Sequence, residues 1–251
     1  MKKVVLLDFH NTLATCDGWL ELEITTLPGL VLERLASDGL VERSAADQKD
    51  RATALFKALR QRVRESGVEI SAVEGARQVL VEMGFAVPDA AIEAAVADLE
   101  HALLPQVEMI PGADAALSKL RDRGYRMGVV SSAGYPLFVE MALEKLGLRT
   151  YFSEVVTSAG EGIYKSDPEI FRRAASKLGV RSEEAVHVGD HAIYDVQTAK
   201  AAGLAAVWFA GQARRTAQLH GTKWEDAAQA GSLADATIEK MEELFDAITS
   251  L

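Results

Sequence analysis

The sequence predicts an α/β fold, a parallel sheet interrupted early in the chain by a long all-helical segment. Short apolar runs rich in Val and Ile alternate with helical patterns in the second half of the chain. Strand, helix and strand repeated in this way favour a parallel sheet with both faces covered by helices. The first half shows helical patterns without that alternation.

Five apolar runs are the predicted strands of the sheet. Each is four or five residues long, which fits a buried strand better than a buried helix. The runs are Val4–Leu7, Met127–Val130, Glu154–Thr157, Ala185–Val188 and Ala205–Phe209.

The segments between these strands have the apolar spacing of helices. In residues 168–178, apolar side chains recur at intervals of three and four, so they share one helical face. Pro111 and Pro168 stand where a proline would begin a helix. Four glycines stand where a left-handed residue would end one: Gly124, Gly147, Gly179 and Gly203.

From about Cys16 to about Leu104, the chain has helical patterns and no convincing strand. Two apolar stripes mark helices there, one at Leu55, Phe56, Leu59 and Val63, the other at Ile92, Val96 and Leu99. An all-helical insert between one strand and an α/β block suggests a second domain. We therefore predict an α/β core of residues 1–15 and 105–251 and a helical domain of residues 16–104.

Arg60, Arg62 and Arg64 form a basic cluster in this helical insert. Glu65 and Glu69 follow closely and balance the charge. This pattern is typical of a solvated helix face, so we expect these arginines to point into solvent.

The charge balance disfavours nucleic acid as a partner. The 251 residues include 27 Lys and Arg against 37 Asp and Glu, a formal charge of −10, and so acidic a surface repels phosphate backbones. The single cysteine, Cys16, excludes a disulfide framework and fits a reducing compartment. The apolar stretches are too short to span a membrane, so we expect a soluble, cytoplasmic protein with no membrane partner.

Chemically active residues follow the predicted strands at one edge of the sheet, where open parallel sheets bind ligands. Asp8 and Ser131 each follow a strand, Lys165 precedes a helix, and Asp190 and Asp195 come after the fourth run. Taken singly, each has an ordinary explanation as a cap, a turn residue or a solvated charge. Together they bring three carboxylates, one ammonium and one hydroxyl to one crevice. Such carboxylates need a cation to relieve their repulsion, and an oxygen-only ligand set suits Mg²⁺.

In order and placement, these residues resemble the four motifs of the haloacid dehalogenase (HAD) superfamily. The motifs are Asp-x-x-x-Thr-Leu at 8–13, a Ser at 131, Lys165 shortly before Asp-Pro, and Gly-Asp-x-x-x-x-Asp at 189–195. The resemblance covers the α/β part of the chain. It implies a Rossmann-like parallel sheet core with an inserted all-α helical cap, which agrees with the position of the insert.

The resemblance also implies roles for individual residues. Asp8 would be the nucleophile that attacks phosphorus and forms an aspartyl-phosphate. Ser131 and Lys165 would act in catalysis by binding the phosphoryl oxygens, and we expect Asn11 and Ser132 to contact the substrate beside them.

The implied ligand set for Mg²⁺ consists of oxygen atoms. Asp8 and Asp190 would supply carboxylates and His10 its backbone carbonyl, while Asp195 would bind the metal directly or support another ligand. Phosphoryl transfer requires neutralisation of the equatorial oxygens, which a metal facing Lys165 would supply.

His10 departs from the family pattern, because most phosphatases of the family carry a second Asp there. That Asp protonates the leaving group and later deprotonates the attacking water. Imidazole, with an unperturbed pKa near about 6.5, can do both at neutral pH. The alternative is that His10 packs within the site and leaves turnover slow.

Four other residues near the motifs have less specific expectations. His187 lies within a strand run and fits a hydrogen-bonded core histidine, whereas His191 can point into the crevice. Cys16 fits a small packed residue. Trp19 opens the cap and fits the substrate pocket and the core equally well.

Three functions follow from these observations. The main hypothesis is a Mg²⁺-dependent phosphatase of a small phosphorylated metabolite. The second is a HAD-like binding protein, catalytically weak because of His10. The third is a metal-independent dehalogenase, which is disfavoured because dehalogenating members typically lack carboxylates like Asp190 and Asp195. Neither the physiological substrate nor the oligomeric state follows from the sequence.

Overall fold

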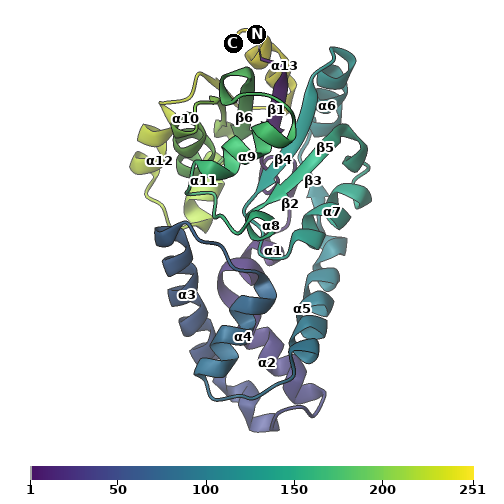
Figure 1. Ribbon diagram of the computed structural model, residues 1–251, viewed down its shortest axis with the longest axis vertical. Helices are drawn as coiled ribbons and strands as arrows, with labels where there is room; N and C mark the ends of the chain where they lie inside the picture. The colour runs from purple at the N-terminus through teal and green to yellow at the C-terminus, as the bar shows by residue number, and fades with distance from the viewer. Residues whose placement is uncertain (1) are drawn as a thin grey trace.

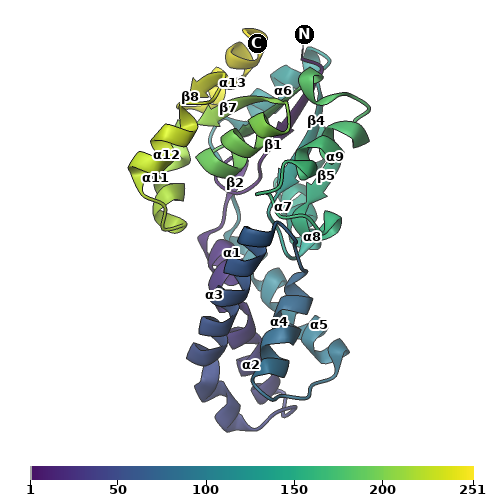
Figure 2. The ribbon, with the colours of Figure 1, turned by 60° about the vertical axis from the view of Figure 1, so that its left-hand side comes forward.

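The computed structural model describes residues 2–251 and comprises a sheet-containing part and an elongated helical part (Figure 1). The helical part extends from one end of the sheet. Both chain termini lie at the opposite end of the molecule, as Figures 1 and 2 show. The junction between the two parts is therefore at the end of the sheet remote from the termini.

The main sheet has six parallel strands in the order β5-β4-β1-β6-β7-β8. They are β1 (Val4–Leu7), β4 (Arg126–Ser131), β5 (Phe152–Thr157), β6 (Ala185–Gly189), β7 (Ala205–Phe209) and β8 (Ala236–Ile238). The five predicted strands are confirmed, two of them with the predicted bounds. The edge strand β8 was not predicted, because three residues are too few to show a periodicity.

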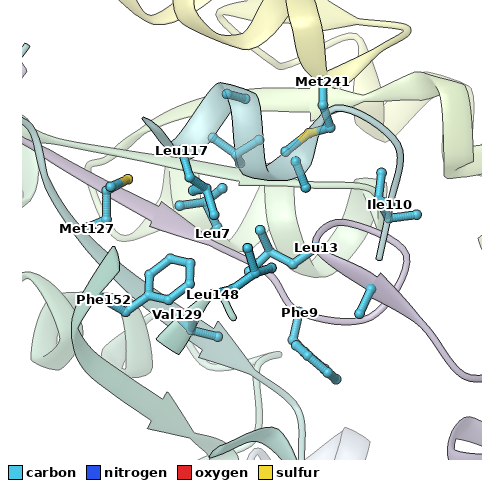
Figure 3. Close-up of a cluster of buried hydrophobic side chains, with 14 of the residues drawn as sticks. Leu7, Phe9, Leu13, Ile110, Leu117, Met127, Val129, Leu148, Phe152 and Met241 are labelled. Carbon is cyan, nitrogen blue, oxygen red and sulfur yellow. The ribbon is translucent and has the colours of Figure 1, made fainter. Parts of the chain in front are cut away.

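Helices cover both faces of this sheet. Val5 and Leu7 of β1 belong to the cluster on one face, which Figure 3 shows, while Val4 and Leu6 belong to the cluster on the other. The first face is covered by α6 (Ala113–Asp122), α7 (Pro136–Lys145) and α13 (Leu244–Thr249), the second by α9 (Glu169–Lys177) and α10 (Thr198–Ala201). All four residues of β1 are fully buried, which explains why its sequence is apolar throughout.

The remaining elements of the sheet part connect these strands or follow them. They are η4 (Arg149–Tyr151), α8 (Ser158–Glu161), η5 (Ser182–Glu184), η6 (Ala192–Gln197), α11 (Ala210–Leu219), α12 (Trp224–Gly231) and η7 (Met241–Glu243). The four predicted helix-ending glycines have φ between 67° and 89° and follow helices, as expected. Pro168 caps α9, whereas Pro111 lies two residues before the start of α6.

The helical part has a hydrophobic core of its own. Leu32, Phe56, Val79 and Val96, from four different helices, are each at most 2% exposed in this core. The elements are α1 (Asp17–Glu21), η1 (Leu22–Thr26), α2 (Leu27–Ser37), η2 (Arg43–Gln48), α3 (Lys49–Ser66), α4 (Ala72–Glu82), α5 (Asp89–Leu103) and η3 (Leu104–Gln106). Both predicted apolar stripes pack into it. The exact domain boundaries at residues 16 and 104 stay a prediction.

A short antiparallel ribbon joins the two parts. It pairs β2 (Ala14–Thr15), where the chain leaves the sheet, with β3 (Glu108–Met109), where it returns. The entry and exit of the helical part are thus hydrogen-bonded to each other. Across residues 2–251, no helix is both long and apolar enough to cross a bilayer.

Candidate active site

The predicted site residues meet at the carboxyl ends of the central strands. Asp8 directly follows β1, Ser131 ends β4, and Asp190 directly follows β6. Together with residues of the helical part, they line one pocket. The topology explains this meeting, because β4 and β6 are the two neighbours of β1.

Lys165 bridges two of the carboxylates. Its Nζ lies 2.6 Å from Asp8 Oδ1 and 2.5 Å from Asp195 Oδ1, and the residue is only 2% exposed. Burial alone would lower the pKa of Lys165, but the two carboxylates outweigh it and raise the pKa, so the side chain stays charged.

Asp8, Asp190 and Asp195 form a buried acidic cluster. Each offers one oxygen atom, and these three atoms lie within 4.8 Å of one another. Burial raises the pKa of Asp8 to about 7 against the opposing charge of Lys165, and repulsion by Asp195 adds to the rise. Burial, followed by repulsion from its two acidic neighbours, also raises the pKa of Asp190 well above its usual value.

This donor set fits a divalent cation. With all groups charged, three carboxylates and one ammonium carry a formal charge of −2, which one divalent ion would neutralise. Mg²⁺ prefers carboxylate oxygens, and its ligands must be deprotonated when it binds. The raised pKa values of Asp8 and Asp190 show the cost of the uncompensated charge.

Asp195 lies in the π-helical turn η6, and hydrogen bonds hold both of its carboxylate oxygens. The turn η6 is a π-helix, a form that occurs frequently at functional sites. Asp195 Oδ1 lies 2.9 Å from His187 Nε2, and Oδ2 accepts a 2.8 Å hydrogen bond from the His191 backbone. Although burial opposes it, Lys165 holds the pKa of Asp195 below its usual range. His187 is thus the buried core histidine that was predicted, bonded through Nε2, while its Nδ1 has no hydrogen-bond partner within residues 2–251.

Gly189 is required by the close approach of Asp195. A Cβ atom at position 189 would lie 2.2 Å from Asp195 Cγ, far inside van der Waals contact. Only glycine lets η6 fold its acidic side chain back against the end of β6. This contact explains why the motif pairs a glycine with an aspartate six residues later.

Asp190 is bonded by two hydroxyl groups. Thr12 Oγ1 donates to Oδ1 at 3.1 Å, and the Thr216 hydroxyl donates to Oδ2. Asn11, which has a positive φ of 60°, donates from Nδ2 to Thr216 Oγ1 at 2.9 Å. Sequence analysis missed Thr216, which lies in α11, because an isolated Thr on a helix face carries no motif.

His10 lies in the pocket with its ring near Trp19, the ring centroids being 5.9 Å apart. Burial lowers the pKa of His10 to about 4, although the charge of Asp17 opposes this. The imidazole is therefore neutral at pH 7 before a substrate binds. Its Nε2 is buried and has no hydrogen-bond partner within residues 2–251. The geometry allows it to accept a proton; its acid/base role stays a prediction.

The predicted substrate-binding residues also line the pocket. Ser131 is 2% exposed, and both Ser132 Oγ and Asn11 Oδ1 are buried without a partner in the described part of the chain. His191 lines the pocket and stacks on Tyr194, with 4.2 Å between ring centroids.

Trp19 and Cys16, at or near the pocket, are both packed in the hydrophobic core. Trp19 lines the pocket and is also a core residue, since it is 1% exposed and stacks on Phe138 at 4.8 Å. Cys16 is 2% exposed and belongs to the core cluster, so it is the packed residue expected from the sequence.

Arg60 corrects the prediction of a solvated basic face. It is 5% exposed, lines the pocket, and bonds Glu69 through Nη1 at 2.6 Å and Nη2 at 3.3 Å. Arg62 is exposed, as predicted. A signal was present in the sequence, because Arg60 lies four residues after Phe56 and three before Val63 on the buried face of α3.

Glu23 is a second buried ionisable residue that sequence analysis missed. Its carboxylate reaches from η1 to the loop after β4, where it accepts hydrogen bonds from Gly134 N at 2.8 Å and Tyr135 N at 3.0 Å. These bonds fix the helical part beside the loop that begins at Ser132, directly after β4. The helical part is thus held over the pocket.

Comparisons with known proteins agree with this arrangement. Residues 2–203 match the model of a family described as haloacid dehalogenase-like hydrolase. A phosphoserine phosphatase of Thermus thermophilus is 33% identical over 230 residues, which cover 82% of this chain and 88% of that protein. A glyceraldehyde 3-phosphate phosphatase of Pyrococcus abyssi is 36% identical over 100 residues, or 40% of this chain. That alignment spans 42% of the Pyrococcus protein, less than half of its length.

A solved structure shows the same fold over the whole chain. A 2-haloacid dehalogenase from Pseudomonas syringae superposes with a TM-score of 0.65, covering 100% of this chain and 99% of that one. Sequence identity is 24%, so the likeness concerns the fold and leaves the chemistry to the site residues.

Proposed function

The chain belongs to the haloacid dehalogenase-like hydrolase family, and from this premise we propose that it is a Mg²⁺-dependent phosphatase of a small phosphorylated metabolite. The observation that carries the proposal is the buried cluster of Asp8, Asp190 and Asp195 facing Lys165. Dehalogenation without a metal does not require a carboxylate cluster that can hold a cation. Removing halide needs no neutralised phosphoryl oxygens, whereas phosphoryl transfer does.

Asp8 is the proposed nucleophile. One of its carboxylate oxygens bonds to phosphorus while the bond from phosphorus to the leaving-group oxygen breaks, and that oxygen takes a proton. Water then attacks the phosphorus of the aspartyl-phosphate, which releases inorganic phosphate and restores Asp8. Lys165 holds Oδ1 of Asp8 at 2.6 Å and so orients the carboxylate before the reaction.

Charge neutralisation in the site would be divided between Lys165 and the cation that the acidic cluster would hold. When bound by Asp8, Asp190 and Asp195, together with the proposed backbone carbonyl of His10, Mg²⁺ would offset the charge on the phosphoryl oxygens. Lys165 and the Ser131 hydroxyl would contact the same phosphoryl group.

His10 is the proposed proton carrier. Its neutral imidazole with an unpartnered Nε2 suits the second step, in which the attacking water loses a proton. In the first step, a bound phosphoryl group brings negative charge next to the ring. That charge raises the pKa of His10 and favours the protonated form, which can donate to the leaving group.

The pocket favours a polar leaving group. Buried polar atoms without a partner among residues 2–251 cost about 1–3 kcal/mol each, and substrate groups can satisfy them. The pocket-lining residues that carry such an atom are His10 (Nε2), Asn11 (Oδ1), Arg60 (Nε) and Ser132 (Oγ). Two relatives are named for phosphoserine and glyceraldehyde 3-phosphate, which are small polar phosphate esters. These observations support a small metabolite as substrate.

Hydrolysis of p-nitrophenyl phosphate tests the proposal. We expect turnover by the wild type with Mg²⁺, its loss with EDTA, and its loss in Asp8→Asn. Acid-quenched wild type should carry phosphate on the peptide that contains Asp8, as seen by mass spectrometry. In the pH profile of the hydrolysis rate, His10→Asp should shift the side of the curve that depends on the protonation of the acid/base residue.

Three results would contradict the proposal. Turnover that survives Asp8→Asn would exclude the aspartyl-phosphate. Halide release from 2-haloacids in the presence of EDTA would favour the dehalogenase alternative. A silent wild type whose activity appears in His10→Asp would instead favour the binding protein.

A further inference from the structure

Helix α11 contributes residues to the pocket. It lies outside the part of the chain that matches the family model, which ends at residue 203. Thr216 and His220 of this segment line the pocket together with Asp8. The helix begins directly after β7, and its start is pressed against the end of β8. A Cβ atom on Gly211 would lie 2.0 Å from the carbonyl oxygen of Glu239, so glycine permits this approach.

One face of α11 is turned inward. Ala213, Thr216 and Ala217 are buried, and their spacing of three and four places them on the same side as His220. Because the alanines are small, the helix lies close to the loops beneath it. Thr216, at 4% exposure, is the polar residue on the buried part of this face.

The hydrogen-bonding role of Thr216 is determined by its partners. Asn11 Nδ2 can only donate, and it does so to Thr216 Oγ1 at 2.9 Å. When Asp190 is ionised to bind a cation, its carboxylate can only accept, so the hydroxyl hydrogen goes to Asp190 Oδ2. The result is a directional chain from Asn11 through Thr216 to Asp190. It connects the loop after β1 with the loop after β6.

Asp190 needs such contacts because the last torsion of an Asp side chain is broad rather than sharply staggered. Thr12 donates to Oδ1 and Thr216 to Oδ2, so hydroxyl groups from two elements hold both oxygens. Each carboxylate oxygen has two lone-pair sites, and one remains on each for a cation. The carboxylate is therefore oriented while it stays able to bind metal.

We propose that Thr216 is a positioning residue that orients Asp190 for a divalent cation, which makes α11 part of the catalytic site of this chain. The inference rests on the proposed function, since it requires that Asp190 binds the cation. Partners of this kind, which hold a ligand without touching the metal, typically contribute 10- to 100-fold to metal affinity.

Mn²⁺ binding to the full chain, measured by calorimetry without substrate, tests the inference. Thr216→Val keeps the shape of the side chain and removes the hydroxyl. We expect it to weaken Mn²⁺ affinity about tenfold. Thr216→Ser keeps the hydroxyl and should bind within about threefold of the wild type. Thr237→Val, at an exposed position of β8, is the matched control and should change nothing.

Each outcome decides the question. Wild-type affinity in Thr216→Val would overturn the inference while leaving the proposed function intact. Failure of the wild type to bind either Mn²⁺ or Mg²⁺ would overturn both. If circular dichroism shows that Thr216→Val does not fold, the comparison of Thr216→Ala with Thr216→Ser replaces it, because these differ in the hydroxyl and little else.

Discussion

Arg60 and Glu69 form an ion pair inside the protein, with side chains 6% and 0% exposed. Glu69 also accepts hydrogen bonds from the Ser158 hydroxyl at 2.7 Å and from Ile70 N at 2.9 Å. A buried pair is stable only when such bonds satisfy its remaining atoms. Removal of one partner leaves the other charge buried and uncompensated.

Arg60→Met should therefore lower the free energy of unfolding by about 3–5 kcal/mol, since it leaves Glu69 without its cation. Urea unfolding of the purified variant measures this change. Arg62→Met, two positions along α3 and exposed, is the control and should stay within about 0.5 kcal/mol of the wild type. If Arg60→Met lowers the free energy of unfolding by less than about 1 kcal/mol, the ion pair contributes no more than one on the protein surface.

Among the secondary-structure elements, η1 and the loop after β4 make the contact that holds the helical part over the site. Glu23 of η1 bonds two successive backbone groups of that loop. The start of α4 bonds the same loop, through Ala72 N and Gly134 O at 2.8 Å. Gly134 is thus a shared point of attachment, and a Cβ atom there would lie 2.8 Å from Glu23 Oε2 and 3.2 Å from Ala72 N.

Gly134→Ala should loosen this attachment, because the methyl group displaces Glu23 from its bonds. A hydrogen bond contributes about 0.5–1.5 kcal/mol, so the loss of two should increase local opening about tenfold. Hydrogen exchange of peptides covering η1 and the start of α4 measures it. Gly160→Ala is the control, because its added methyl would meet the Thr157 side chain at 2.9 Å but no atom of η1 or α4. Unchanged exchange in Gly134→Ala would show that the loop adjusts without cost.

At the scale of the whole molecule, the sheet part and the helical part together enclose the acidic cluster and keep it from water. That enclosure raises the pKa of Asp8 to about 7, above its usual value of 3.8. A group whose pKa is raised by folding contributes stability below its unfolded pKa, which is lost as pH rises through the folded pKa. Ionised Asp8 therefore destabilises the metal-free protein above pH 7, and a bound cation removes this destabilisation.

Mg²⁺ should consequently raise the thermal unfolding midpoint more at pH 8 than at pH 6. At pH 6, protons on Asp8 and Asp190 compete with the cation, and at pH 8 they do not. Scanning fluorimetry with and without Mg²⁺ at both pH values measures the difference. Asp190→Asn should lose the effect, and the exposed Asp122→Asn should keep it. An equal shift at both pH values would place the cation elsewhere.

The sequence by itself determined the sheet and the residues that follow its strands. Asp8 and Asp190 were identified because a residue at the end of a strand is positioned by its own chain neighbours, and Asp195 because of its spacing after Asp190. The order of the strands then brings these ends together. Strand bounds were predicted well, as for Ala205–Phe209, because a short buried run of β-forming residues is a local signal.

Only the tertiary structure decided which side chains surround those residues. Thr216 meets Asn11 across 205 positions of sequence, and Glu23 meets Gly134 across 111. The environment of Arg60 likewise depends on packing between the two parts. Because of this packing, Arg60 is buried, although the sequence predicted it to be in solvent. The physical reason is that a polar side chain is placed by its partner and by the water it loses. Both depend on segments that are distant in sequence and meet only when the chain has folded.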